Sequence, residues 1–253
     1  MVGPLFFAVG QLFYSLMFEI RFVFGNQSIT QNDIQTLQEH FPYFGRLTTK
    51  RQREFTRKLA FFISIKRFVP RGGLKQVSRE MVILISATAV MVAFGYRRVN
   101  YRHFRTILVY PDNYYSTITK QYHKGEVNPK LGIIVVSWSN FTFGLEGEKD
   151  GINLGIHEMA HALKLENQIH YNQESNFFNP RDWQAFLFLA RREIDSMTQG
   201  AESVFRQSAA RDLHEFFAVA LETFFEKPEE LRVTKPAIYK VLVSLLRQDP
   251  LDL

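Results

Sequence analysis

Residues 155–163 read Gly-Ile-His-Glu-Met-Ala-His-Ala-Leu and contain the pattern His-Glu-x-x-His, with His157 and His161 four residues apart. On an α-helix, side chains four residues apart are rotated by only about 40° and lie one turn apart on the same face. The two imidazoles could therefore bind one metal ion. Glu158 lies between them and could act as a general base toward water at that metal. The pattern predicts a helix that carries a metal site.

The residues around the two histidines are apolar, which is typical of a buried helix; they are Ile156, Met159, Ala160, Leu163 and Leu165. Two histidines in such a helix are costly unless each has a metal or a hydrogen-bonding partner. The alternative is that both are ordinary core or surface histidines with partners from the protein. We therefore expect a metal-binding helix and keep the second interpretation open.

A catalytic zinc site needs a third protein ligand and an open position for water. The long metzincin motif is excluded because Lys164 and Asn167 stand where it requires Gly and His. A carboxylate from a later helix is the remaining option. The segment 214–226 is largely apolar and offers Glu215 and Glu222, which are seven residues apart and so share one helix face. Periodicity does not say which of the two is the ligand.

The composition limits the available chemistry. The chain has 253 residues, 46% of them hydrophobic, which is enough to bury a large core. It has no cysteine, which excludes disulfides, thiolate metal sites and cysteine nucleophiles. The strong metal ligands left are seven histidines and 25 carboxylates. The formal net charge of +6 is mild for this length and does not by itself indicate nucleic acid.

The remaining segments predict a mostly helical α/β or α+β protein with a small sheet. Thr106–Tyr110 and Gly132–Trp138 are short, β-branched runs and predict strands, the second of them an edge strand that could pair with a peptide. The polar stretch Asn113–Lys130 between them predicts a long loop. Met81–Phe94 is too short to cross a membrane and predicts a buried helix. Further helices are expected near 49–62, 151–166, 180–196, 211–226 and 234–247.

The first 26 residues form a hydrophobic N-terminal segment, and residues 27–253 form the expected folded domain. Val2–Phe18 carries no charge, but 17 residues are at the lower limit for a membrane span. Residues 1–24 are therefore either a membrane anchor or a helix that packs against protein. The chain lacks a signal-peptide pattern. We expect a cytoplasmic protein, which an anchor would attach to the inner face of the membrane.

Positive charge is concentrated between Arg46 and Lys75, a stretch that contains ten basic residues and a single acidic residue, Glu54. A solvated helix face over Thr49–Phe62 is the simpler interpretation. If the first segment is an anchor, the same charges favour contact with anionic headgroups. The sequence contains no nucleic-acid-binding module, so we expect no nucleic-acid partner.

Several motifs, taken together and in order, resemble the Mlc titration factor A family of zinc-dependent peptidases, which is related to the catalytic domain of anthrax lethal factor. They are Ser137-Trp138, Asp150-Gly151-x-Asn153, the His-Glu-Met-Ala-His segment at 157–161 and the Glu-Phe-Phe-Ala-Val-Ala-x-Glu segment at 215–222. The resemblance extends from about Phe41 to Leu251. It implies a zincin-like fold of the gluzincin type. It also implies one zinc ion on His157, His161 and Glu215, with Glu158 as the general base.

The resemblance also bears on neighbouring residues. It implies that Glu222 orients His214 or one of the metal ligands. Relatives often carry a tyrosine seven residues before the ligand glutamate, placed to stabilise the oxyanion, whereas this chain has Ser208. Loss of an oxyanion donor can lower turnover by two to three orders of magnitude. Lys164 also departs from the acidic residue found in better-known relatives.

Two functions follow as hypotheses. The first is a zinc metallopeptidase, with aminopeptidase-like specificity favoured by the resemblance, that acts on a peptide or protein substrate. The second is a zinc-containing binding protein that sequesters a transcriptional regulator with little catalysis, because the family's namesake is known for sequestering a glucose-responsive repressor. Ser208 favours the second hypothesis slightly.

Overall fold

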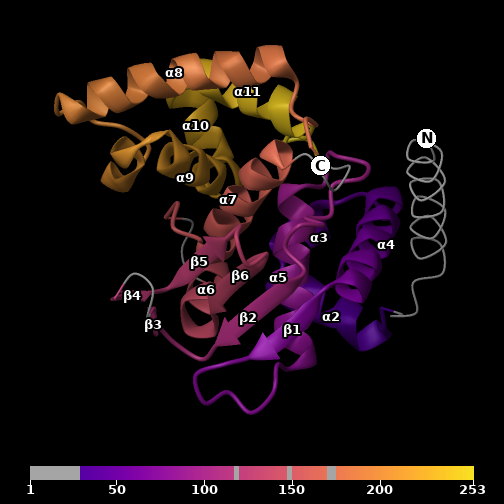
Figure 1. Cartoon of the computed structure of the whole chain (residues 1–253). Helices are drawn as coiled ribbons and strands as arrows, with labels where there is room; N and C mark the ends of the chain where they lie inside the picture. Colours follow the sequence, from indigo (N-terminus) through magenta and orange to yellow (C-terminus); the bar gives the residue numbers. More distant parts are fainter. Residues whose placement is uncertain (1–28, 117–119, 147–149, 170–174) are drawn as a thin grey trace, which may run out of the picture.

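The computed structural model describes residues 29–116, 120–146, 150–169 and 175–253 (Figure 1). The predicted N-terminal segment 1–26 lies outside these ranges, so its role as an anchor and the domain boundary after it stay predictions. Within the described ranges, none of the helices combines the length and the apolar character that a membrane crossing requires.

A small mixed sheet has the strand order β1-β2-β6-β5. Strands β1 (Arg67–Pro70), β2 (Thr106–Tyr110) and β6 (Ile133–Ser137) are parallel, and β5 (Gly125–Asn128) pairs antiparallel with β6 at the end of the sheet. Ile107 and Val109 alternate with less buried neighbours along β2, whereas β6 is buried over most of its length. The nearly continuous burial of β6 is typical of a strand inside a sheet rather than at its edge.

The structure confirms the two predicted strands and corrects two expectations about their surroundings. The strand at 133–137 is internal, since β2 and β5 flank it, and the strand at that edge of the sheet is β5, with β1 at the opposite edge. The polar stretch 113–130 is not one loop. Besides β5 it contains β3 (Tyr114–Ser116) and β4 (Gln121–His123), which form a separate antiparallel pair.

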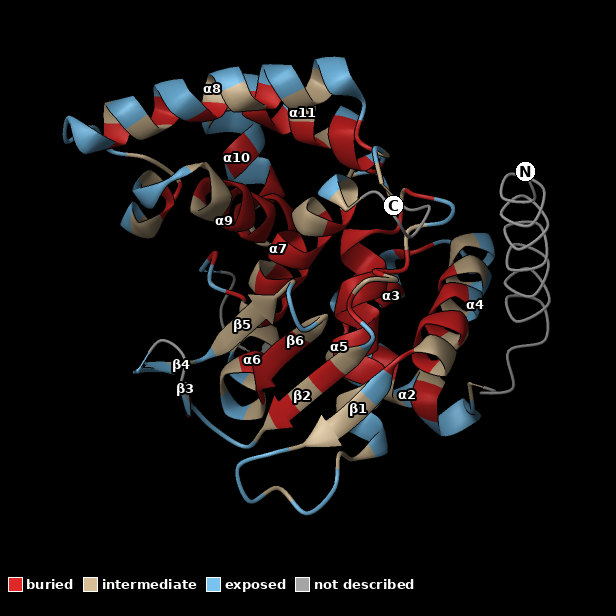
Figure 2. Cartoon of the chain, in the orientation of Figure 1, coloured by how far each residue is buried: buried red, intermediate tan, exposed pale blue. Residues whose placement is uncertain are grey.

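The N-terminal half of the described chain packs around helix α5 (Arg79–Val92), which matches the buried helix predicted from its apolar run. Ser78 caps this helix through a hydrogen bond from the Met81 amide. Residues 83–92 are all buried, and in Figure 2 most of the helix has the colour of buried residues. Its neighbours include α2 (Gln31–His40), α4 (Thr49–Ile65) and α7 (Leu154–Gln168). The short helix α3 (Pro42–Arg46) connects α2 to α4.

The basic run between Arg46 and Lys75 is solvated only in part. Lys50, Arg53 and Arg57 on α4 are exposed, as a solvated face requires. Lys58, in contrast, is buried, and its Nζ donates to the carbonyl oxygens of Phe94 at 2.7 Å and Tyr96 at 2.8 Å. The interpretation of this stretch as a solvated helix face is therefore wrong for Lys58, which satisfies carbonyls beyond the end of α5.

The C-terminal half is a group of helices on the other side of α7 (Figure 1). Helix α8 shows its exposed face along the outside of the molecule (Figure 2), and its buried residues Phe186, Ala190, Glu193 and Met197 recur every three or four positions. The elements of this half are α8 (Pro180–Thr198), the 3₁₀ helix η1 (Gln207–Arg211), α9 (Leu213–Glu226), α10 (Pro228–Thr234) and α11 (Pro236–Leu246). The short helix α6 (Trp138–Glu146) precedes α7 and lies beside the sheet (Figure 1).

Helix α7 lies between the two halves. It contacts α5, β5 and β6 on one side and α9 on the other. The described chain is thus mostly helical with one small mixed sheet, as expected for an α+β protein, and the predicted helices near 151–166, 180–196, 211–226 and 234–247 are all present with ends shifted by a few residues. The His-Glu-x-x-His segment is in the middle of the molecule, where both halves can contribute side chains.

Candidate metal centre

Two helix starts define the site. Helix α7 begins after Asn153, whose side chain accepts a hydrogen bond from the Ile156 amide. Helix α9 begins after Asp212, whose side chain accepts from the amides of His214 and Glu215. Both are the side-chain caps that favour helix initiation. The cap of α9 places Glu215 in its first turn, where that helix contacts α7.

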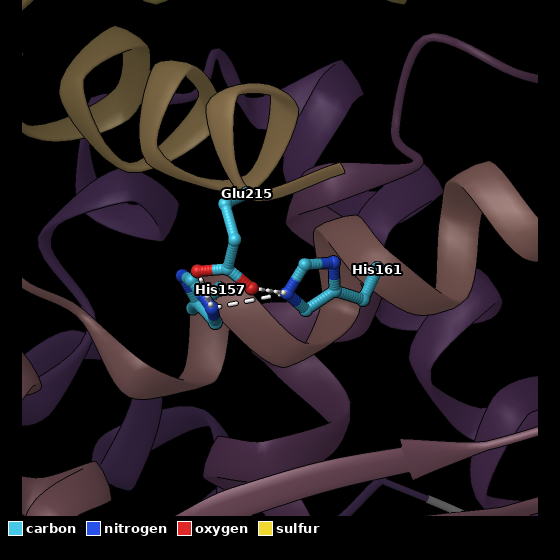
Figure 3. A group of neighbouring side chains, drawn as sticks. All are labelled: His157, His161 and Glu215. Atoms are coloured by element: carbon cyan, nitrogen blue, oxygen red, sulfur yellow. Dashed lines mark hydrogen bonds and ion pairs between the residues drawn. The ribbon is translucent and has the colours of Figure 1, made fainter. Parts of the chain in front are cut away.

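The structure brings His157, His161 and Glu215 together (Figure 3). The Nε2 atoms of the two histidines are 3.0 Å apart. The Glu215 carboxylate lies 3.4 Å from Nε2 of His161 and 3.8 Å from Nε2 of His157. Among the residues that the structure describes, this is the one group of three such side chains able to hold a metal ion.

The separations between these atoms fit a metal. Zinc binds histidine nitrogen and carboxylate oxygen at about 2.0–2.2 Å in a tetrahedron, so its ligand atoms lie roughly 3.3–3.6 Å from one another. The observed separations are 3.0 Å between the two nitrogens, 3.4 Å from His161 to Oε1 of Glu215 and 3.8 Å from His157 to Oε2 of Glu215, so each lies within about 0.3 Å of this range. Two imidazole nitrogens and one carboxylate oxygen are also a usual donor set for a catalytic zinc. The residues present therefore fit such an ion.

Glu222 takes a different position from Glu215. It is buried, with an exposed fraction of 1%, and its Oε1 lies 2.7 Å from Nδ1 of His157, on the side of the ring away from Glu215. Its other oxygen accepts from the Asn153 amide at 2.6 Å. A carboxylate in this place fixes the orientation of a metal-binding histidine. The resemblance implies that Glu222 orients either His214 or a metal ligand. In the structure its partner is His157, one of the three candidate ligands.

Glu158 faces the sheet. It is 5% exposed and lies against Gly125 of β5, so close that a Cβ atom on Gly125 would be 2.5 Å from Oε1 of Glu158. Burial raises the pKa of Glu158 to about 7, with the nearby charge of His157 opposing that shift. A carboxyl group with a pKa near neutrality can both accept and return a proton.

The other charges of the site are also perturbed. The hydrogen bond to His161 lowers the pKa of Glu215 to about 2, although burial opposes this shift. Burial lowers the pKa of His161, because desolvation disfavours the imidazolium. Burial acts in the same direction on His157, but the hydrogen bond to Glu222 and the surrounding carboxylates outweigh it and raise the pKa. The group thus combines an ionised carboxylate with a histidine that favours its neutral form.

The two departures noted in the sequence lie beside this group. The Lys164 Nζ is 3.1 Å from Nδ1 of His214, and the ring of His214 lies 4.1 Å from that of His161. Ser208 is in η1, where its hydroxyl accepts from Nε of Arg206 at 2.9 Å. Ser208, which stands where the resemblance implies a tyrosine, is therefore already hydrogen-bonded to another residue of the protein.

Sequence reasoning missed Arg206 and Gly125. Arg206 precedes η1 in an irregular segment, without a periodic or motif signal to mark it. Gly125 lies in the stretch expected to be a loop, and a single glycine there gave no indication of close packing against Glu158.

The comparisons with known proteins define the class. The family model described as glucose-regulated metallo-peptidase M90 matches residues 19–247. This covers most of the chain, which therefore belongs to that family of metallopeptidases, and the family implies a metal ion.

The individual relatives have low sequence identity to this chain, but the matches cover most of both chains. An uncharacterized protein of Synechocystis sp. is 26% identical over 230 residues, covering 85% of this chain and 83% of the relative. Mlc titration factor A of Yersinia enterocolitica is 27% identical over 233 residues, covering 84% of both chains. The protein of the same name from Yersinia pestis is also 27% identical, with 84% and 83% covered. The resemblance to the Mlc titration factor A family is confirmed.

Proposed function

We propose that this chain is a zinc-dependent peptidase of zincin-like architecture, with His157, His161 and Glu215 as the metal ligands. The convergence of these three side chains from two helices, at separations that suit one ion, carries the proposal. Zinc bound there supplies a Lewis acid that polarises a carbonyl group and makes water more acidic. The family membership supports peptide hydrolysis as the reaction.

Glu158 is the proposed general base. It follows His157 directly on α7, and its burial against Gly125 shields it from bulk water. In this role it accepts a proton from the attacking water and passes it to the leaving nitrogen. His157 and His161 would hold the ion through their Nε2 atoms and would therefore take no part in proton transfer.

The substrate peptide is proposed to lie along β5. This strand ends the sheet, and Gly125 at its start lies against Glu158. A peptide that pairs with an exposed strand gains main-chain hydrogen bonds along its length. The predicted peptide-binding strand is thus moved from 133–138 to 125–128, and the mode of binding is retained.

A peptide-cleavage assay followed by mass spectrometry tests the mechanism. Glu158→Gln keeps the size of the side chain and removes the base. We expect it to retain one zinc per chain and a wild-type melting temperature while turnover falls by at least about 100-fold. Equal turnover by the two proteins, at equal zinc content, would contradict the role of Glu158.

A second function is favoured by one observation, the engagement of Ser208 by Arg206 where the resemblance leads one to expect a free tyrosine. It is sequestration of a transcriptional regulator with little catalysis, in line with the name of the Yersinia relatives. Binding to a purified candidate repressor by calorimetry separates the two functions. Sequestration predicts that Glu158→Gln binds the repressor as tightly as the wild-type protein does, and that neither protein cleaves it.

A further inference from the structure

Arg206 lies behind His157, on the side of the ring that faces Glu222. Its Nη1 donates to Oε2 of Glu222 at 2.7 Å, and its Nη2 is 3.2 Å from Nδ1 of His157. Coulomb's law alone makes this an unfavourable place for a fixed positive charge, since a metal ion held by His157 would be repelled. A cation beside a cation site needs another reason to be there.

The guanidinium is held on two further sides. Its Nη1 also donates to the carbonyl oxygen of Gly151 at 3.1 Å, and its Nε donates to Ser208 at 2.9 Å. Contacts from η1 and from the segment before α7 thus fix the direction in which Arg206 points. Ser208 acts here as the support for Arg206.

These contacts determine how Glu222 is used. Its Oε2 accepts from both Arg206 and the Asn153 amide, at 2.7 and 2.6 Å. The other oxygen, Oε1, is left for Nδ1 of His157 at 2.7 Å. Because the carboxylate is buried and held from two sides, it cannot rotate away from the histidine without losing both donors.

We propose that Arg206 is a positioning residue for the metal site, acting through Glu222. It holds the carboxylate so that Oε1 accepts a hydrogen from Nδ1 of His157, which leaves Nε2 directed at Glu215 and His161. The inference rests on the proposed metal site and deepens it. It also gives Ser208 a role in place of the missing tyrosine, as the residue that orients Arg206.

The test compares two arginine substitutions by zinc affinity, measured by competition with a chelator of known affinity. Arg206→Met removes the positioning contact. Arg211→Met is the matched control, since Arg211 lies 3.8 Å from Glu215, is well exposed and, among the described residues, makes neither a hydrogen bond nor an ion pair with Glu222. Both changes remove one positive charge next to the site.

The two hypotheses for Arg206 give opposite signs. Charge alone predicts that both variants bind zinc as tightly as wild type or more tightly. Positioning predicts that Arg206→Met loses about 10–100-fold in zinc affinity, as is usual when an outer contact of a metal-binding histidine is removed, whereas Arg211→Met loses none. A purely structural role would lower the melting temperature and leave the affinity of the folded protein unchanged.

A double-variant cycle identifies the route. If Arg206 acts through Glu222, then Arg206→Met combined with Glu222→Gln should lose little more zinc affinity than Glu222→Gln alone. Multiplied losses would overturn the route through Glu222. Wild-type affinity in Arg206→Met would overturn the inference and leave the metal site standing, and absence of zinc binding by wild type would overturn both.

Discussion

Gly125 of β5 lies directly against the side chain of Glu158, the candidate base. A side chain at position 125 would collide with Oε1, Cδ and Cγ of Glu158, at 2.5 to 2.7 Å. Glu158 is buried and has little room to withdraw. The glycine therefore allows β5 to approach the base directly.

Gly125→Ala should displace the Glu158 carboxylate without removing a metal ligand. We expect turnover to fall by about 100-fold, because a shift of about 1 Å in a catalytic group can cost that much. Zinc content should stay at the wild-type level. Kinetics on a short peptide, with metal analysis of the same sample, measure both.

Gly45→Ala is the control for this change. A Cβ atom at position 45 would meet nothing within 4 Å, so this variant adds the same methyl group in open space and should cleave at the wild-type rate. A Gly125→Ala protein as active as Gly45→Ala would show that the close contact does not position the base.

The residue scale also shows what the sequence could and could not predict. The four-residue spacing of His157 and His161 was enough to place both on one face of a helix. The seven-residue spacing of Glu215 and Glu222 was not enough to tell them apart, since both fall on one face of α9. Their contacts differ because α9 crosses α7 with its first turn near Nε2 of His157 and its third turn near Nδ1. A crossing of two helices is a tertiary property that local spacing does not contain.

At the scale of elements, the end of α9 is tied to the segment before α7. Glu226 accepts from the Gly151 amide at 3.1 Å and from the Asn153 side chain at 2.9 Å. Burial raises the pKa of Glu226 to about 7, even though these hydrogen bonds oppose the shift, and the charges of Glu222 and Asp150 add to it. The folded protein therefore keeps a proton that the unfolded chain releases near pH 4.5.

This shift gives the contribution of Glu226 to stability a definite sign. Between about pH 4.5 and 7 the folded state binds more protons than the unfolded state, so that contribution falls as the pH rises through this range. Glu226→Gln removes the titrating group. We expect the free energy of unfolding of the metal-free variant to decline less over this range than that of wild type, as measured by urea titration at each pH.

Glu229→Gln on the exposed surface of α10 is the control and should follow the wild-type curve. The same decline in Glu226→Gln as in wild type would show that Glu226 ionises normally in the folded protein.

Lys58 ties the end of α5 to α4. Lys58→Met removes the ammonium group that donates to the carbonyl oxygens of Phe94 and Tyr96, so both oxygens lose that hydrogen bond. We expect the free energy of unfolding to fall by about 2–4 kcal/mol, because the carbonyls are buried. Lys50→Met on the exposed face of the same helix should change it by less than about 0.5 kcal/mol. Equal unfolding curves for both variants would contradict the structural role of Lys58.

The elements that the sequence predicted share strong local signals. Buried helix α5 has a long apolar run, and β2 and β6 are rich in β-branched residues. Strand β5 has one apolar residue, Val127, and lacks the alternation of a half-buried strand. It forms by pairing antiparallel with the next strand, β6, in a hairpin, and its own residues carry too weak a strand pattern to predict that pairing. The same pairing makes β6 internal and moves the edge of the sheet to β5.

On the scale of the whole molecule, the candidate site joins two halves. His157 and His161 belong to α7, which packs on the sheet and α5, whereas Glu215 belongs to the C-terminal helices. An ion held by all three would link α7 to α9. Because such an ion binds the folded chain and not the unfolded one, it should stabilise the protein by mass action.

The most direct test of the central claim is the zinc content of the purified protein, measured by elemental analysis together with the melting temperature before and after chelation. We predict one zinc per chain, a lower melting temperature after chelation, and loss of both the zinc and the chelator effect in His161→Ala and Glu215→Ala. The proposed site would be contradicted if the wild-type protein holds no zinc after dialysis against a zinc-containing buffer. It would also be contradicted if Glu215→Ala binds zinc as tightly as the wild-type protein does.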